Sequence, residues 1–340
     1  MKKSGAVFFV IFLLSAVFVG FAPASVQGAY EGLRLACDTV VPSLLPMLIL
    51  FLILMKSEAL TFITRLFGWI AVRLFNLPAV CTPAIITGLA GGYPTGALMT
   101  LELYGADEID GAQAERLMCF NFCGGVGFIV TALGSARLGS TRLGAVLYLS
   151  NLTASLVIGV LLSFTEKRGN MPVCALRASM PIPDALVSSV NSAVKSVISL
   201  TAYIMLFSGF LCLLPSVKYL VPIFEITSGV CGKESFSAEL LSAYLAFGGF
   251  CVHLQLLPVI RKFHMSYLRF LFFRLLCSAL SALACRALML FIPVTQSVFS
   301  NESIKAAKLT GVSPAMSFLL VLGGALFFSD LASRRIIHSR

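Results

Sequence analysis

An acidic side chain lies in apolar surroundings in the second half of the chain, where Glu225 stands between two apolar residues and precedes Thr227 and Ser228. A carboxylate at membrane depth is costly and usually functional. At such a depth Glu225 would bind a proton or Na⁺, or it would form hydrogen bonds with a substrate, next to the hydroxyl groups of Thr227 and Ser228. The alternative is that residues 219–237 form an exposed loop, in which the charge is simply solvated.

Residues 88–96 (GLAGGYPTG) combine four glycines and a proline inside an apolar run, although both residue types are poor helix formers. A broken helix presents free backbone N–H groups at the positive end of its dipole, and this arrangement stabilises anions. Two glycines let a ligand approach the backbone, the proline fixes the turn, and the tyrosine and threonine line the site. The predicted binding residues are Gly91, Gly92, Tyr93, Pro94 and Thr95. The alternative is a kink that serves only close helix packing.

Other polar side chains also fall in apolar segments. Asn121 needs partners if it is buried, and it is either a ligand of the substrate or part of an interhelical hydrogen bond. Lys195 either extends to the cytoplasmic interface or reaches an anionic ligand. His253 and Gln255 either line a pathway or pack between helices.

The composition indicates that these residues lie in a membrane protein. Hydrophobic residues make up 58% of 340 and charged residues 12%, about half the share in soluble domains. The net charge of +10 comes mainly from basic residues between apolar runs, which is typical of cytoplasmic loops and argues against nucleic-acid binding. The ten cysteines are scattered and the three histidines far apart, so we expect no metal site.

The apolar runs predict an all-α polytopic fold of about eight to ten membrane segments. The expected segments are 5–22, 40–55, 79–103, 117–135, 142–164, 194–214, 238–260, 268–292 and 314–331. Residues 58–77 alternate apolar side chains with two arginines and predict a helix along the membrane surface. The first helix is either retained or cleaved as a signal peptide.

The basic loops and the number of membrane crossings between them predict a re-entrant hairpin. If Lys2, Lys3 and the basic C-terminal tail are cytoplasmic, three full crossings between residues 79 and 164 would place the basic stretch 165–185 outside. A turn-back at residues 88–96 removes this conflict, because irregular backbone is tolerated at membrane depth when protein surrounds it. The alternative is that the orientation rule fails for this chain.

The two halves of the chain repeat one pattern. A polar break (GLAGGYPTG, FEITSGV) precedes a Gly-Gly pair inside an apolar run (NFCGGVGFIV, LAFGGFCVHLQ), and paired breaks are typical of transporters built from inverted repeats. The alternative is a chance similarity, because glycine is common in membrane helices. The expected units begin with an N-terminal helix and linker (residues 1–30) and a first gate-like repeat (31–165). A cytoplasmic linker (166–185), a second gate-like repeat (186–292) and an extracytoplasmic loop with the last helix and basic tail (293–340) follow.

The segments GLAGGYPTGA, EIDGAQAERLMCFNFCGG, YLSN and FEITSG resemble those of the YlbJ-type sporulation integral membrane proteins. That family looks related to the gate, or nucleoside-recognition, domains of concentrative nucleoside transporters. The resemblance covers residues 32–165 and 186–290. It implies two re-entrant hairpins and movement of dipicolinic acid, a planar dianion, across the membrane around a developing spore. This sequence departs from the family pattern at Leu98, where a lysine is common, and after Asn121, where a proline is usual.

We therefore predict a transporter, not an enzyme, for a small anionic metabolite, with its site formed by Gly91, Gly92, Tyr93, Pro94, Thr95, Asn121, Glu225, Thr227 and Ser228. The expected partners are this substrate and the lipid bilayer of the cell membrane, with both termini cytoplasmic. No cofactor is expected beyond a coupling Na⁺ or H⁺, and the oligomeric state is open. The alternatives are a scaffold protein of the spore envelope and a nucleoside-type transporter.

Overall fold

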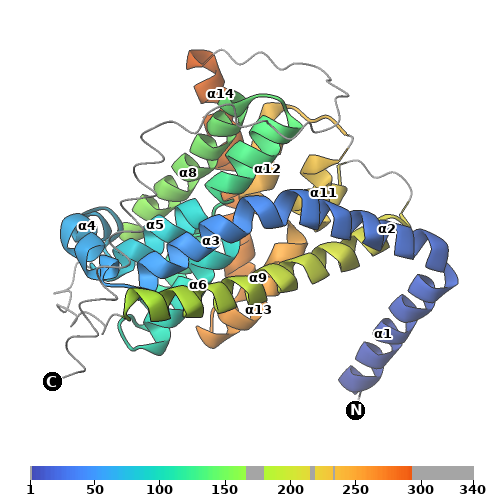
Figure 1. The fold of residues 1–340 in the computed structure, drawn as a ribbon, viewed down its shortest axis with the longest axis horizontal. Coiled ribbons are helices and arrows are strands. Elements are labelled where there is room, and N and C mark those ends of the chain that lie inside the picture. The colour runs from blue at the N-terminus through green and yellow to red at the C-terminus, as the bar shows by residue number, and fades with distance from the viewer. Residues whose placement is uncertain (1, 166–179, 215–218, 233, 293–340) are drawn as a thin grey trace.

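The computed structural model describes residues 2–165, 180–214, 219–232 and 234–292. Helices account for nearly all of this part of the chain, and it contains no strand, which confirms the predicted all-α class. The expected helix at 314–331 and the basic tail lie outside the described residues. Figure 1 shows the helical architecture, with the first helix projecting from the others.

The N-terminal part forms one helix that projects from the rest and one long helical rod. Helix α1 covers Lys2–Gly20 and ends before Phe21. Helix α2 (Ala22–Leu35), the π-helical turn η1 (Ala36–Val40) and helix α3 (Val41–Lys56) then continue without a break. Most of the expected linker is therefore helical, because Pro23 occupies the first turn of α2, where the missing N–H costs nothing.

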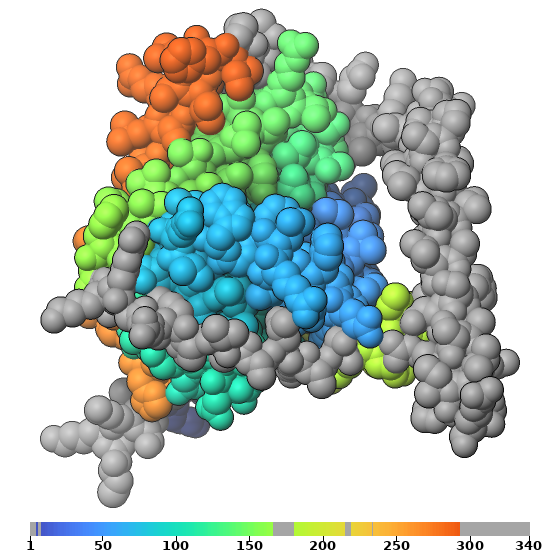
Figure 2. All heavy atoms as spheres, turned by 90° about the vertical axis from the view of Figure 1, so that its left-hand side faces the viewer, coloured from blue at the N-terminus to red at the C-terminus, as the bar shows by residue number. Residues whose placement is uncertain are grey.

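Helix α4 (Ala59–Phe75) has the predicted amphipathic character. Phe62 and Trp69 are 67% and 56% exposed, and Arg65 is exposed between them. The helix ends at Phe75, and the following residue, Asn76, has a φ of 51° in the left-handed region. Figure 2 faces this part of the molecule and shows α4 on its surface, so one apolar side of the helix is exposed, and its position along a membrane surface stays a prediction.

The first half then contains two interrupted segments before its last helix. Helices α5 (Cys81–Gly91) and α6 (Tyr93–Gly105) are separated by Gly92. Helix α7 (Gly111–Phe120), which Asp110 caps, is separated from the π-helical segment η2 (Gly127–Arg137) by non-helical residues. The expected continuous segment 117–135 is thus wrong in its middle. Helix α8 (Thr141–Ser163) completes this half.

The second half follows the same order. It begins with the long helix α9 (Ile182–Leu211) and the short pair α10 (Val221–Phe224) and α11 (Ile226–Cys231). The broken pair α12 (Ala238–Phe247) and α13 (Gly249–Lys262) and the last helix α14 (Tyr267–Phe291) follow. The expected single helix 238–260 is interrupted because Gly248 and Gly249 have φ of 87° and 75°, values that side chains with a Cβ rarely adopt.

Corresponding elements of the two halves pack against each other. The rod of α2 and α3 lies along α9, and α8 packs on α14 (Figure 1). The cross-contacts are reciprocal, since α7 meets α14 while α12 meets α8. A two-fold relation between the halves would produce such pairs, while the inverted repeat itself stays a prediction.

Five helical stretches in the described residues are long and apolar enough to cross a membrane. They are Ala22–Lys56, Thr141–Ser163, Ile182–Leu211, Ala238–Lys262 and Tyr267–Phe291. The surroundings of the molecule are therefore a lipid bilayer. The shorter broken segments lie between these stretches in the sequence, while the turn-back itself and the side on which each terminus lies stay predictions.

Candidate functional site

The break between α5 and α6 places glycines against a second break. Gly92 has a φ of 108°, and a Cβ there would lie 3.2 Å from the backbone nitrogen of Gly125. A Cβ on Gly125 would in turn lie 3.0 Å from the carbonyl oxygen of Gly91. Pro94 stands in the first turn of α6, where proline favours helix initiation. The glycines of GLAGGYPTG therefore bring two backbones together.

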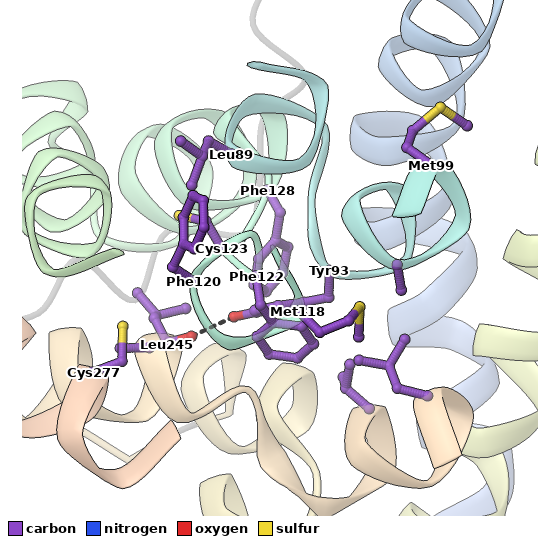
Figure 3. Packing of buried hydrophobic residues seen from close by; sticks show 14 of the residues in the cluster. Leu89, Tyr93, Met99, Met118, Phe120, Phe122, Cys123, Phe128, Leu245 and Cys277 are labelled. Atoms are coloured by element: carbon purple, nitrogen blue, oxygen red, sulfur yellow. Dashed lines mark hydrogen bonds between the residues drawn. The ribbon is translucent and has the colours of Figure 1, made fainter. Parts of the chain in front are cut away.

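Tyr93 connects the two halves of the chain. Its hydroxyl donates a 2.5 Å hydrogen bond to the carbonyl oxygen of Leu245 in α12, and its ring lies 4.8 Å from that of Phe122 between centroids. Figure 3 shows this bond bridging the helices. Tyr93 is thus a buried contact between repeats in this structure.

Asn121 is wedged between the two helices of the first pair. A Cβ at Gly88 in α5 or at Gly96 in α6 would overlap Asn121, so both glycines make room for it. The side-chain nitrogen donates to the carbonyl oxygen of Ala84 at 2.9 Å. The Oδ1 atom, like Oγ1 of the buried Thr95, has no hydrogen-bond partner among the described residues.

Glu225 is fully buried, so it does not lie in an exposed loop. It stands between α10 and α11 and accepts hydrogen bonds from the backbone nitrogens of Thr227 (2.9 Å) and Ser228 (2.5 Å). The carboxylate therefore caps α11. Burial raises the pKa of the Glu225 carboxyl, while its hydrogen bonds with Ser228 and Thr227 oppose that shift.

The breaks of both halves meet at the Gly248–Gly249 interruption of the α12–α13 pair. A Cβ on Gly248 would lie 2.9 Å from the ring of Phe122 and 3.4 Å from the ring of Tyr93. A Cβ on Gly249 would lie 3.1 Å from the backbone nitrogen of Ile226 in α11. We call this region, formed by Gly92, residues 121–125, Glu225 and Gly248–Gly249, the break junction.

The structure thus gathers the predicted site residues into two groups. Gly91, Gly92, Tyr93, Pro94, Thr95 and Asn121 form the first, and Glu225, Thr227 and Ser228 form the second. Gly248 and Gly249 lie between them. No direct hydrogen bond joins the groups in the described part of the chain, so their connection is through packing.

Two other polar residues singled out in the sequence are His253, which has partners inside the protein, and Lys195, which lies in a groove along α9. His253 is buried, with Nε2 at 2.9 Å from the carbonyl oxygen of Phe247 and Nδ1 at 3.1 Å from the hydroxyl of Tyr267, and this favours a packing role. Lys195 is exposed in an open groove of about 560 Å³ that α9 lines together with Met180. Among the described residues, no group of three or more His, Cys, Asp or Glu could hold a metal ion.

Arg274 is a buried charged residue at this site that the sequence did not predict. It lies inside α14, is fully buried, and donates hydrogen bonds to the carbonyl oxygens of Phe122 (2.7 Å) and Cys119. These carbonyls belong to the end of α7 and the break that follows it. The available signal was an arginine well inside an apolar run, since such residues usually face the protein interior.

The comparisons with known proteins agree with the membrane architecture. No family model matches the chain, and no solved structure matches it. The sporulation integral membrane protein YlbJ of Bacillus subtilis (strain 168) is 24% identical over 314 aligned positions, covering 77% of each chain. The chain is thus similar to a sporulation integral membrane protein over about three quarters of its length. The YlbJ-type resemblance of its motifs is thereby supported, while the link to nucleoside-recognition domains stays a prediction.

Proposed function

We propose that this protein is a membrane transporter, not an enzyme, that moves a small anionic metabolite through the break junction. The observation that carries the proposal is the meeting of helix breaks from both halves at Gly248 and Gly249. In transporters made of two repeats, discontinuous helices at the repeat interface bind substrate and coupling ion. Non-helical backbone inside a membrane is tolerated where protein or a cavity surrounds it.

Unpaired polar atoms support a ligand at this junction. Thr95 Oγ1 and Asn121 Oδ1 are buried without hydrogen-bond partners among the described residues. Buried polar groups normally have partners, and a substrate would supply them during part of a transport cycle.

Dipicolinic acid is the substrate we propose, on the resemblance to the YlbJ-type proteins. The similar Bacillus protein is named as a sporulation protein, and we extend that role to this chain. Glu225 is the proposed site of coupling to H⁺ or Na⁺. The protein would lie in the cell membrane with both termini in the cytoplasm.

The test is uptake of dipicolinate into liposomes that contain the purified full-length protein. We expect saturable uptake that Glu225→Gln largely removes without changing the amount of folded protein in the membrane. Glu31→Gln, at an exposed position, is the matched control and should retain uptake. No uptake of dipicolinate or of the nucleoside uridine would contradict a transport role, whereas uptake of uridine alone would favour a nucleoside-type transporter.

A scaffold protein of the spore envelope is the second candidate. Tyr93, Asn121 and Glu225 all make internal hydrogen bonds, as residues that only maintain a fold would do. For a scaffold, we expect Glu225→Gln to leave spore assembly unchanged whenever the variant protein accumulates normally. Loss of spore function at a normal protein level would contradict this candidate.

A further inference from the structure

Arg274 is a buried cation whose hydrogen-bonding capacity is only partly used. Its side chain is fully buried in α14, and its terminal nitrogens donate to two neutral carbonyl oxygens, those of Phe122 and Cys119. Its Nε atom has no partner among the described residues. A guanidinium group has five N–H donors in a planar fork, so donors remain for a further acceptor.

The charge of Arg274 is not matched by a carboxylate in the described part of the chain. Arg269, five residues earlier on the same helix, forms an ion pair with Glu115 at 2.6 Å, although it is half-exposed. Taking an uncompensated charge out of water costs several kcal/mol. The two carbonyls belong to the negative end of α7, which offsets only part of this cost. An anion would complete the compensation.

Arg274 also lies at the break junction. Its guanidinium carbon is 4.6 Å from the centroid of the Phe122 ring and 5.6 Å from that of Phe270. Phe122 in turn packs on Tyr93 and against Gly248, and it is labelled beside Tyr93 in Figure 3. The cation is therefore one side chain away from the interface of the two repeats.

We propose that Arg274 is the residue that binds the anionic group of the ligand, and that this group is a carboxylate. The planar fork of arginine matches the two oxygens of a carboxylate. This inference rests on the proposed function, since it names the chemistry that the same site recognises.

The test compares ligand binding by full-length variants in detergent, because a ligand that binds only the folded protein raises its unfolding temperature. The probes are pyridine-2,6-dicarboxylate, benzoate and acetate, with uncharged pyridine-2,6-dicarboxamide as their control. We expect at least one carboxylate to stabilise the wild type and the diamide to have no effect. Arg274→Lys should need at least about tenfold more carboxylate for the same shift, and Arg274→Gln should not respond. Arg286→Gln, an exposed arginine of the same helix, should respond as the wild type does.

A purely structural arginine would give a different result. Arg274→Lys would then unfold at a lower temperature without ligand but respond to carboxylate at wild-type concentrations, which would overturn the inference and leave the transport proposal standing. Arg274→Lys keeps the charge and decides the question if Arg274→Gln does not fold. Stabilisation that depends on Arg274 without uptake into liposomes would support the binding site and contradict transport. No response of the wild type to any carboxylate would overturn the inference, while uptake into liposomes separately decides the transport proposal.

Discussion

In the first half of the chain the break at Gly92 is supported by uncharged groups, whereas in the second half the break before α11 is supported by a carboxylate. Asn121 fills the space between Gly88 and Gly96 and donates one hydrogen bond to Ala84. Glu225 instead accepts two backbone hydrogen bonds at the start of α11. The two breaks occupy corresponding places in the order of elements, yet different side chains satisfy the backbone there.

This difference separates a packing role from a titratable one. The amide of Asn121 forms the same hydrogen bonds at every pH, so the first break has one electrostatic state. The carboxyl of Glu225 has two states because its proton can leave, and its burial makes the charged state costly. The break in the first half therefore keeps one charge state at every pH, whereas the break in the second half can change its charge state with pH.

The largest expected effect breaks the packing of the first half. In Gly96→Ala, the added Cβ would overlap Asn121, and we expect a loss of about 3 kcal/mol in the free energy of unfolding. The measurement is the thermal unfolding midpoint of the purified protein, with expression level as a second readout. Gly105→Ala is the matched control in the same helix, because nothing lies within 4 Å of its Cβ position. Equal midpoints for the two variants would contradict the wedge role of Asn121.

Several breaks could be predicted from the sequence because the residues that cause them are local. Glycines and a proline mark the interruption at Gly92, and a charge between apolar residues marks the one at Glu225. The break at residues 121–125 could not be placed in the same way, since Arg274 binds the carbonyl oxygen of Phe122 in the break and that of Cys119 before it from a helix more than 150 residues away. Likewise, α2 continues into α3 because packing against α9 supports residues that looked like a linker.

The burial of Asn121 and Glu225 is consistent with their positions in apolar runs, but their arrangement could not be predicted from the sequence. Asn121 and Glu225 stand out as polar residues in apolar runs, and both are buried. Their separation into two groups follows from tertiary packing around Gly248 and Gly249, which no spacing in the sequence records. Arg274 carried a signal as an arginine inside an apolar run, but its contacts with Phe122 and Cys119 of the first half could not be predicted from the sequence.

A smaller effect is expected when the cap in the second half is removed. In Glu225→Ala, the backbone N–H groups of Thr227 and Ser228 lose their acceptors, and buried unpaired donors of this kind cost about 2 kcal/mol. Glu225→Gln keeps one acceptor oxygen and should fall between Ala and the wild type. The unfolding midpoints of the three proteins at one pH check this order. A Gln variant less stable than the Ala variant would contradict the capping role.

The pH dependence of stability should distinguish the two halves. Because the pKa of the Glu225 carboxyl is raised in the folded protein, its stabilising contribution is fully present below the ordinary carboxyl pKa of 4.5. It is lost as pH rises through the raised pKa, since the unfolded chain then binds fewer protons than the folded one. We expect the unfolding midpoint of the wild type to fall over this window and Glu225→Gln to lack that part of the fall.

The converse variant moves this dependence to the first half. In Asn121→Asp, the side chain can donate to the carbonyl oxygen of Ala84 only when it is protonated, as the native amide does at any pH. This variant should therefore be nearly as stable as the wild type at low pH and lose stability as pH rises. The midpoints of Asn121→Asp, Glu225→Gln and the double variant across pH test whether the two contributions add. A pH profile of Asn121→Asp identical to that of the wild type would contradict the donor role of Asn121.

The smallest expected effect concerns the far end of α11. Arg137, an exposed residue at the end of η2, donates hydrogen bonds to the carbonyl oxygens of Cys231 (3.0 Å) and Gly232. A cation at the carboxyl end of a helix stabilises it by about 0.3–1 kcal/mol at an exposed position. Arg137→Met should lower the unfolding midpoint slightly, and high salt should shrink the difference because salt screens exposed charges. Arg142→Met, which removes an exposed arginine at the start of α8, is the matched control and should not show this loss. A salt-independent loss in Arg137→Met would assign the effect to packing, and the second half would then rest on one charged group, Glu225, instead of two.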